Sequence, residues 1–251
     1  MTLQADLRGR RALITGASSG LGAFFACTLA AAGAEVVLAA RRRTQLEQIA
    51  AKIRLDGGQA EIVELDVGSG ASVSVAASQW GRIDILVNNA GVTNSKPLLE
   101  QAEADWDAIL DINLKGAWLV SMEVARQMRA DGRGGSIINI ASILGLRQAG
   151  HVTPYAVSKA GLLQLTKQLA LELARYGIRV NALAPGYVAT DLNAGFFESA
   201  PGQALVRRIP QRRLGTLSEL AGPLLLLASE ASGYMTGAVL VIDGGHLLSS
   251  L

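Results

Sequence analysis

The 251-residue sequence contains a single cysteine, Cys27, so no disulfide can form within the chain. Because Cys27 lies in an apolar helical run, we interpret it as a small buried side chain. Because the chain can form no internal disulfide, we expect a reducing, cytoplasmic location. Histidine is almost as scarce: His151 and His246 are the only two, and no spacing typical of metal ligands relates them. The sequence therefore predicts that no metal is bound.

Neither sign of charge dominates the composition. The 23 Lys and Arg residues nearly balance the 21 Asp and Glu residues, which gives no electrostatic preference for nucleic acid or an anionic membrane. Residues 1–11 are polar and lack the apolar core of a signal peptide. Residues 21–40 are apolar enough to resemble a membrane span, but Gly33, Ala34 and Glu35 interrupt them. We therefore expect neither a nucleic-acid partner nor a membrane span.

Hydrophobic residues make up 50% of the chain, which suits a well-filled core. Short apolar runs typical of buried strands alternate with helical patterns, and these runs are apolar on both faces. This order predicts one α/β domain over residues 1–251, a Rossmann-type doubly wound parallel sheet of about seven strands with helices on both faces. The predicted strands are 11–15, 36–40, 60–65, 83–87, 136–141, 178–183 and 238–242. Helices are expected at 23–32, 44–55, 71–80, 104–128, from about 155 to 176, and at 217–229.

A glycine cluster follows the first predicted strand and precedes a helix. Its spacing, Gly16, Gly20 and Gly22, is G-x-x-x-G-x-G, which differs from the common G-x-G-x-x-G dinucleotide fingerprint. Glycines in this setting permit a tight turn and let the backbone approach a pyrophosphate, which then faces the helix N-terminus. An ordinary strand-to-helix turn is the alternative, and the flanking strand and helix favour the dinucleotide site.

The end of the second predicted strand indicates which dinucleotide is bound. A site for NAD usually has Asp or Glu here to accept from the ribose 2′-hydroxyl, whereas an arginine suits the 2′-phosphate of NADP. Ala40 takes the place of the carboxylate, and Arg41 follows it. We therefore favour NADP(H) through Arg41, with NAD(H) as the alternative. Arg42 and Arg43 are interpreted as the solvated start of a helix.

Tyr155 and Lys159 are four residues apart in a helical pattern, so they lie on the same face of the helix. A nearby ammonium favours the phenolate and so lowers the pKa of a tyrosine, which can then exchange a proton with a carbonyl or an alcohol. Alone, this spacing also occurs in helices with a surface lysine. Asn113 lies inside a predicted helix, where it is either a tolerated surface residue or distorts the helix toward the site.

Polar residues and glycines recur where the predicted strands end. Asp66, residues 88–91, Ser142 and Pro185-Gly186 all occupy such positions. The carboxyl ends of parallel strands share one edge of the sheet, where open α/β sheets bind their ligands. One crevice can therefore collect them together with the glycine turn, Arg41 and the Tyr155–Lys159 pair.

In this combination, from Gly9 to Gly245, the chain resembles the short-chain dehydrogenase/reductase family, particularly its 3-oxoacyl-(acyl-carrier-protein) reductase-like members. The resemblance implies that Tyr155 is the general acid in reduction and the base in oxidation. It implies that Lys159 holds the nicotinamide ribose and lowers the pKa of Tyr155. Ser142 would position the reacting oxygen, and Asn113 would hold a water that links Lys159 to solvent.

The resemblance also implies cofactor contacts, and apolar and loop residues near the reactive stretch and in the lid are candidate substrate contacts. For the cofactor these are Gly16, Ser18, Ser19, Gly20, Leu21, Gly22, Arg41, Asp66, Val67, Asn88, Ala90, Gly91, Tyr155, Lys159, Pro185, Gly186, Val188 and Thr190. The expected substrate contacts are Leu144, His151, Val152, Phe196 and Phe197, with an irregular substrate lid at about 188–214. His151 is alternatively a solvated loop residue. The lid arginines, Arg207, Arg208, Arg212 and Arg213, either steer an anionic acyl carrier or are solvated charges.

The function expected from this resemblance is NADP-dependent interconversion of a ketone and a secondary alcohol. The ketone would be a 3-oxoacyl thioester or a small carbonyl compound, and the resemblance implies a homotetramer. An NAD-linked alcohol or sugar dehydrogenase of the same family is the first alternative. A non-catalytic dinucleotide-binding regulator is a second, although such proteins typically lack a member of the set that Asn113, Ser142, Tyr155 and Lys159 complete here.

Overall fold

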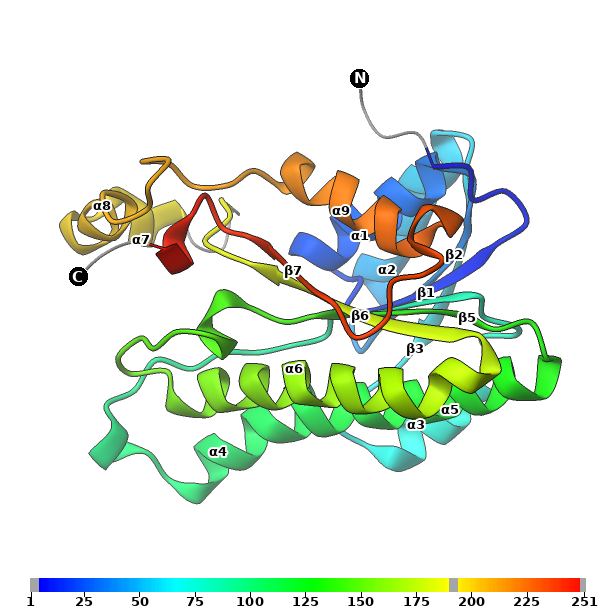
Figure 1. Cartoon of the computed structure of the whole chain (residues 1–251), viewed down its shortest axis with the longest axis horizontal. Helices are drawn as coiled ribbons and strands as arrows, with labels where there is room; N and C mark the ends of the chain where they lie inside the picture. The colour runs from blue at the N-terminus through cyan, green and yellow to red at the C-terminus, as the bar shows by residue number, and fades with distance from the viewer. Residues whose placement is uncertain (1–4, 190–193, 249–251) are drawn as a thin grey trace.

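The computed structural model describes residues 5–189 and 194–248, and these contain one seven-stranded parallel sheet (Figure 1). The strand order is β3-β2-β1-β4-β5-β6-β7, which confirms the predicted Rossmann-type arrangement. The strands are β1 (Arg11–Thr15), β2 (Glu35–Ala40), β3 (Gln59–Glu64), β4 (Ile85–Asn88), β5 (Gly135–Ile140), β6 (Ile178–Pro185) and β7 (Val239–Ile242).

Helices cover both faces of the sheet (Figure 1). One face carries α1 (Gly20–Ala31), α2 (Arg43–Leu55) and α9 (Ala221–Ala228). The other face carries α3 (Gly70–Ala77), α4 (Glu103–Leu110), α5 (Ala117–Asp131) and α6 (Thr153–Leu173). Two short helices, α7 (Ala194–Glu198) and α8 (Ala200–Val206), lie beyond the carboxyl ends of β6 and β7.

The strands are apolar on both faces because each face supplies its own core. Successive strand residues point to opposite sides, so Ile14 packs in the layer of α1 and α9, whereas Leu13 packs in the layer of α3 and α5. Phe25 of α1 and Val124 of α5 are fully buried members of these two layers. Because helices cover both faces of the sheet, the edge at the carboxyl ends of its strands is where a ligand can bind.

The helix predicted at 104–128 is interrupted at its middle. A π-helical turn, Asp111–Gly116, separates α4 from α5 and contains Asn113. Both polar atoms of the Asn113 side-chain amide bond to residues outside the helix: Oδ1 accepts from Val92 N (2.8 Å), and Nδ2 donates to Val92 O (2.9 Å). Asn113 therefore distorts the helix toward the site, as one of the two sequence interpretations expected.

The segment expected to be irregular, 188–214, contains α7 and α8. Ser199 caps α8 by accepting from Gly202 N (3.3 Å), and Pro201 lies in the first turn, where a helix tolerates proline. Gly202 packs so closely on the Phe196 main chain that a Cβ would collide with it. Pro201 thus starts the helix α8 and Gly202 allows it to pack closely. Both residue types are common in loops, so the sequence did not indicate a helix here.

Candidate active site

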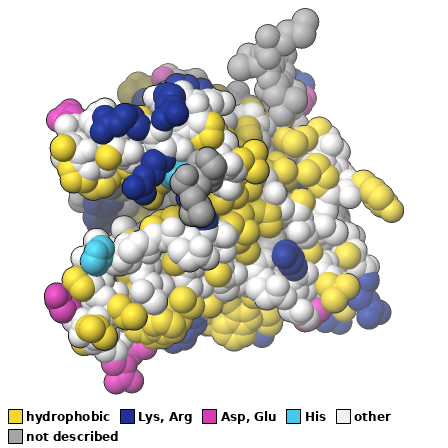
Figure 2. Space-filling model, turned by 60° about the vertical axis from the view of Figure 1, so that its left-hand side comes forward, with side chains coloured by type: hydrophobic (Ala, Val, Ile, Leu, Met, Phe, Trp, Pro, Cys, Tyr) yellow, Lys and Arg dark blue, Asp and Glu magenta, His cyan; other side chains and the backbone are white. Residues whose placement is uncertain are grey.

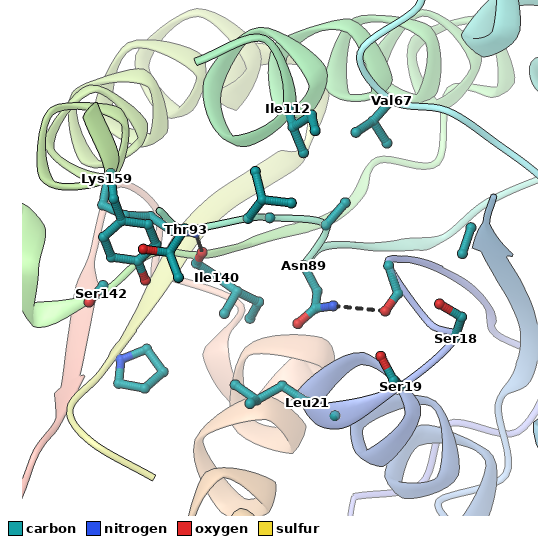
Figure 3. Close-up of a pocket in the computed structure, with 18 of the residues that line it drawn as sticks. Ser18, Ser19, Leu21, Val67, Asn89, Thr93, Ile112, Ile140, Ser142 and Lys159 are labelled. Carbon is teal, nitrogen blue, oxygen red and sulfur yellow. Dashed lines mark hydrogen bonds between the residues drawn. The ribbon is translucent and has the colours of Figure 1, made fainter. Parts of the chain in front are cut away.

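A pocket of about 550 Å³ follows the carboxyl ends of β1 to β6 (Figure 3). It is long enough to take residues from the glycine turn at one end and from α6 at the other. Among the described residues, the predicted cofactor and catalytic residues that line it are Gly16, Ser18, Ser19, Gly20, Leu21, Arg41, Asp66, Val67, Ala90, Gly91, Ser142, Tyr155, Lys159, Pro185, Gly186 and Val188. The strand ends therefore converge as the sequence predicted.

The glycine turn is built for close backbone approach. Gly16 has a positive φ of 66°, and a Cβ at Gly22 would collide with the main-chain oxygen of Gly16. Asn89 holds the turn from the next strand, because its Nδ2 donates to Thr15 O (3.0 Å) and Gly16 O (3.3 Å) (Figure 3). The turn leads directly into α1, whose first residues Gly20 and Leu21 line the pocket, so the free N–H groups of a helix N-terminus are near enough to suit a pyrophosphate here.

Asn88 and Asn89 take different places from those expected. The Asn88 side chain is buried beneath the pocket, where its Nδ2 donates to Ser121 Oγ (2.8 Å) and Asn139 Oδ1 (2.9 Å). Asn89, which was not among the predicted site residues, lines the pocket instead. Successive residues of a strand point to opposite sides, so this alternation could have indicated that only one of the two asparagines faces the pocket.

Two arginines stand at the end of β2. Arg41 lines the pocket and is exposed. Arg42 is exposed as well, and its Nη2 donates to Ser18 Oγ (2.9 Å) and Ser19 Oγ (2.7 Å). Its guanidinium thus lies across the glycine turn, beside Arg41 and the pocket. Arg42 is thus a solvated residue at the start of α2, as expected, and it also lines the pocket beside Arg41.

The reactive groups gather at the opposite end of the pocket (Figure 3). Ser142 follows β5, and its Oγ accepts from Leu144 N (3.1 Å). Tyr155 lies in the first turn of α6, and Lys159 follows one turn later, with its Nζ 5.7 Å from the centre of the Tyr155 ring. Lys159 Nζ donates to Ile140 O (2.8 Å), which ties α6 to the end of β5.

Asn113 supports this end of the site without lining the pocket. Its Nδ2 donates to Ser158 Oγ (3.0 Å), and Ser158 Oγ in turn donates to Tyr155 O (2.7 Å). A Cβ at Gly91 would lie 3.3 Å from Asn113 Oδ1 and 3.5 Å from Lys159 Nζ, so these two polar groups face the same glycine. Asn113 therefore connects the π-helical turn to the helix that carries the phenol.

Burial shifts the pKa values of Tyr155 and Lys159 in opposite directions. Burial raises the pKa of Tyr155, and a hydrogen bond with Ser142 acts against this. Burial lowers the pKa of Lys159 to about 8. Burial is thus the largest influence on both groups, and the expectation that Lys159 lowers the pKa of Tyr155 stays a prediction.

The predicted substrate residues lie outside the lining of this pocket, and Thr190 lies outside the described residues. Phe197 is buried, whereas Phe196 is half exposed; the two rings meet edge to face at 5.1 Å. His151 is exposed and has a positive φ of 66°. Leu144 and Val152 are partly buried near Ser142 and the start of α6. Tyr187, which the sequence reasoning did not select although both its neighbours were named, lines the pocket.

Two further features follow from the described residues. No helix in the described ranges is both long and apolar enough to cross a membrane. In the same ranges, no group of three His, Cys, Asp or Glu side chains is arranged to hold a metal ion.

Comparison with known proteins shows the family to which the chain belongs. A family model described as Enoyl-(Acyl carrier protein) reductase matches residues 16–246. The chain is 39% identical over 249 residues to a 2-dehydro-3-deoxy-D-gluconate 5-dehydrogenase of Escherichia coli, covering 96% of this chain and 97% of the relative. It is 40% identical over 246 residues to a 3-oxoacyl-(acyl-carrier-protein) reductase of Thermotoga maritima, covering 96% of this chain and 99% of the relative.

A solved structure resembles the chain at the same level of sequence identity. The gluconate 5-dehydrogenase of Burkholderia cenocepacia, crystallised with NADP and tartrate, superposes with a TM-score of 0.94 at 39% identity and covers 98% of each chain. The chain belongs to the short-chain dehydrogenase/reductase family. It is accordingly an NAD(P)-dependent oxidoreductase, as the resemblance predicted.

Proposed function

We propose that the protein interconverts a ketone and a secondary alcohol with NADP(H), using Tyr155 as the general acid and base. The observation that carries this proposal is the convergence of Ser142, Tyr155 and Lys159 at one end of the pocket whose other end holds the glycine turn and two arginines. Bound NADPH would supply the hydride, and the residues of the chain would bind, orient and move the proton.

Each reactive residue has a role that its geometry supports. Ser142 lies within hydrogen-bonding range of the Tyr155 phenol, so a carbonyl oxygen between them would be oriented by both groups. The raised pKa of Tyr155 keeps its proton in place at neutral pH, which suits donation to a carbonyl. Lys159, held by Ile140 O, lies beside the phenol and faces Gly91, where a ribose would pass.

The preference for NADP(H) is supported by Arg41 and Arg42 together with the absence of a carboxylate at Ala40. Solved relatives of this fold, including the Burkholderia cenocepacia enzyme, hold NADP. An NAD-linked dehydrogenase of the same family is the alternative, and parallel assays with both cofactors separate the two.

Two substrate classes follow from the relatives: sugar acids and 3-oxoacyl thioesters. Arg213, one of the lid arginines expected to steer an acyl carrier, is instead held by both oxygens of Glu219 (2.9 and 2.7 Å). That pairing leaves less positive charge on the lid for an acidic carrier. We therefore favour a small carbonyl substrate, with the segment 188–214 as the lid above it.

The test is the loss of NADPH absorbance with purified protein and a panel of ketones, with NADH in parallel. We expect turnover of a small ketone that is at least tenfold faster with NADPH than with NADH at low cofactor concentration. If the protein binds NADPH yet turns over no ketone and oxidises no secondary alcohol, the regulator alternative replaces the enzyme.

We also propose a homotetramer. Trp106, Trp118, Val157 and Leu171 expose apolar surface on the α4, α5 and α6 layer, and the outer edge of β7 has no strand beside it among the described residues. A second copy of the chain would cover both surfaces. Light scattering during size exclusion tests this: four chain masses are expected, and a monomer contradicts it. A cytoplasmic location stays a prediction from the sequence.

A further inference from the structure

The proposed reaction uses the hydroxyl groups of Ser142 and Tyr155, but the same pocket holds two more hydroxyl-bearing side chains. Tyr187 follows the end of β6, Thr93 lies in the loop after β4, and both line the cavity. Figure 3 shows Thr93 at the end of the pocket where Ser142 and Lys159 lie. The proton transfer needs neither Thr93 nor Tyr187, so both hydroxyls are available for another role at this end of the pocket.

Tyr187 is held in place by its ring and by its main chain. The ring meets Phe197 edge to face, with the centroids 5.7 Å apart, and lies 5.6 Å from the His246 ring. The main-chain oxygen of Tyr187 accepts from Gly215 N (2.9 Å). The phenol is therefore fixed before a ligand arrives, and a group fixed in advance loses little conformational entropy on binding.

The hydroxyls of Tyr187 and Thr93 have no hydrogen-bond partner in the part of the chain that the structure describes. In the sheet, β5 lies between β4 and β6, so the segments that carry Thr93 and Tyr187 lie on opposite sides of the one that carries Ser142. Burial is the main cause of the raised pKa of Tyr155, and the Tyr187 phenol adds to the rise, which requires the two phenols to be close. Two unused hydroxyls therefore border the place of the reacting oxygen.

These two side chains can also be reached from solvent. Tyr187 is half-buried beneath Phe197 of α7, and Thr93 is exposed. Figure 2 shows that the surface is hollowed beneath the lobe of α7 and α8. A small ketone can therefore enter the pocket beside both hydroxyls.

We infer that Tyr187 and Thr93 bind a hydroxyl group of a short hydroxyketone, one or two carbons from the reacting carbonyl. A hydroxyl both donates and accepts, as do a phenol and a threonine, so the three groups satisfy one another without any charge. A methyl group in place of that hydroxyl displaces water from both side chains and gives them no partner. The inference rests on the proposed function and narrows its small carbonyl substrate to this class.

Matched ketones test the subsite. Hydroxyacetone and 2-butanone differ by the exchange of a hydroxyl for a methyl group, and so do 4-hydroxy-2-butanone and 2-pentanone, which carry it one carbon further from the carbonyl. For at least one pair we expect kcat/KM to be about tenfold or more higher for the hydroxyketone. A smaller ratio in both pairs would overturn the inference and leave the proposed function standing.

Two variants test the residues. Tyr187→Phe and Thr93→Val each remove one hydroxyl and keep the size of the side chain. Each is expected to lower the ratio of kcat/KM for the hydroxyketone to that for its matched ketone by about fivefold or more. An unchanged ratio, even with lower activity on both ketones, would show that the residues only support the structure. Tyr234→Phe is the control, because it removes the same hydroxyl from a fully exposed ring outside the pocket and should leave the ratio unchanged.

Binding tests the inference independently of turnover. In protein saturated with NADPH an alcohol has no hydride acceptor, so the fluorescence of bound NADPH can follow its binding. Propane-1,2-diol is compared with 2-butanol, and butane-1,3-diol with 2-pentanol; at least one diol should bind about fivefold or more tightly than its alcohol, and Tyr187→Phe should remove the difference.

The outcomes of this titration are distinct. If neither diol binds more tightly than its alcohol, the inference is wrong. If a diol binds more tightly but no ketone is reduced with either cofactor, the proposed function fails and the hydroxyl subsite remains.

Discussion

Lys159 Nζ donates a hydrogen bond of 2.8 Å to the main-chain oxygen of Ile140, at the last residue of β5. The lysine is buried, and burial lowers its pKa to about 8. The ammonium is therefore placed beside Tyr155 at a cost in stability, since a buried charge loses its hydration. Residues that lower the stability of the fold and are held in place within a site typically have a functional role.

The pH dependence of stability should show this cost. Burial lowers the pKa of Lys159 from 10.5 to about 8 in the folded protein, so below about pH 8 the whole penalty of the buried charge applies. Between the two values the unfolded state binds more protons, and stability therefore rises with pH. Relative to Lys159→Met, the wild type should gain roughly 2 kcal/mol of unfolding free energy between about pH 7 and about pH 9.5. Urea titrations at both pH values measure it, and parallel pH profiles would contradict the assignment.

Arg41 and Arg42 should each contribute to the choice of cofactor. Removing a charge-assisted contact to the 2′-phosphate should raise KM for NADPH about tenfold in Arg41→Ala and in Arg42→Ala, with little change for NADH. Arg43→Ala is the matched control, because Arg43 points along α2 and pairs with Glu47 (3.0 Å). Steady-state kinetics with both cofactors tests this. Equal losses for NADPH and NADH would remove the 2′-phosphate role.

Gly22 should tolerate no side chain. A methyl group at this position would collide with Gly16 O and so force the glycine turn apart. We expect Gly22→Ala to weaken NADPH binding at least tenfold, measured by fluorescence titration, and to lower the thermal midpoint. Gly222→Ala in α9 is the control, because nothing lies near its Cβ, and it should leave binding unchanged. Unchanged binding in Gly22→Ala would show that the turn is not a pyrophosphate site.

Ser142 should tune the proton-transfer step in alcohol oxidation, where Tyr155 must lose its proton. Burial raises the pKa of Tyr155, and the hydrogen bond with Ser142 opposes that rise. Without the hydroxyl, the phenolate loses a partner, so the pKa rises further. In Ser142→Ala we expect a lower kcat/KM and a rising limb of the pH profile that moves to higher pH. A limb that moves to lower pH would contradict the role given to Ser142.

Much of the fold was predictable because strands and helices differ in periodicity. The runs at 11–15 and 178–183 were apolar on both faces, and both proved to be buried strands of the parallel sheet. The segment 188–214 was expected to be irregular, and the helices within it were missed for a local reason. Pro201 and Gly202 are residue types that usually mark loops, but here Pro201 lies in the first turn of α8 and Gly202 packs closely against the main chain.

The lining of the pocket was predictable where a residue follows the end of a strand, as Ser142 does. It was less predictable where side-chain direction decides. Asn88 and Asn89 are neighbours of equal chemistry, yet only Asn89 faces the pocket. The contact of Arg42 with Ser18 depends on the fold, and the raised pKa of Tyr155 comes from burial, which helix spacing does not reveal.

The central claim is that Tyr155 transfers the proton while the rest of the site binds cofactor unaided. The most direct measurement is turnover by Tyr155→Phe, compared with NADPH binding by the same preparation. Phenylalanine keeps the ring and removes only the hydroxyl. The account predicts a loss of kcat of about a thousandfold, in the range of general acid–base catalysis, with NADPH affinity within a few-fold of the wild type. Full turnover in Tyr155→Phe would contradict it.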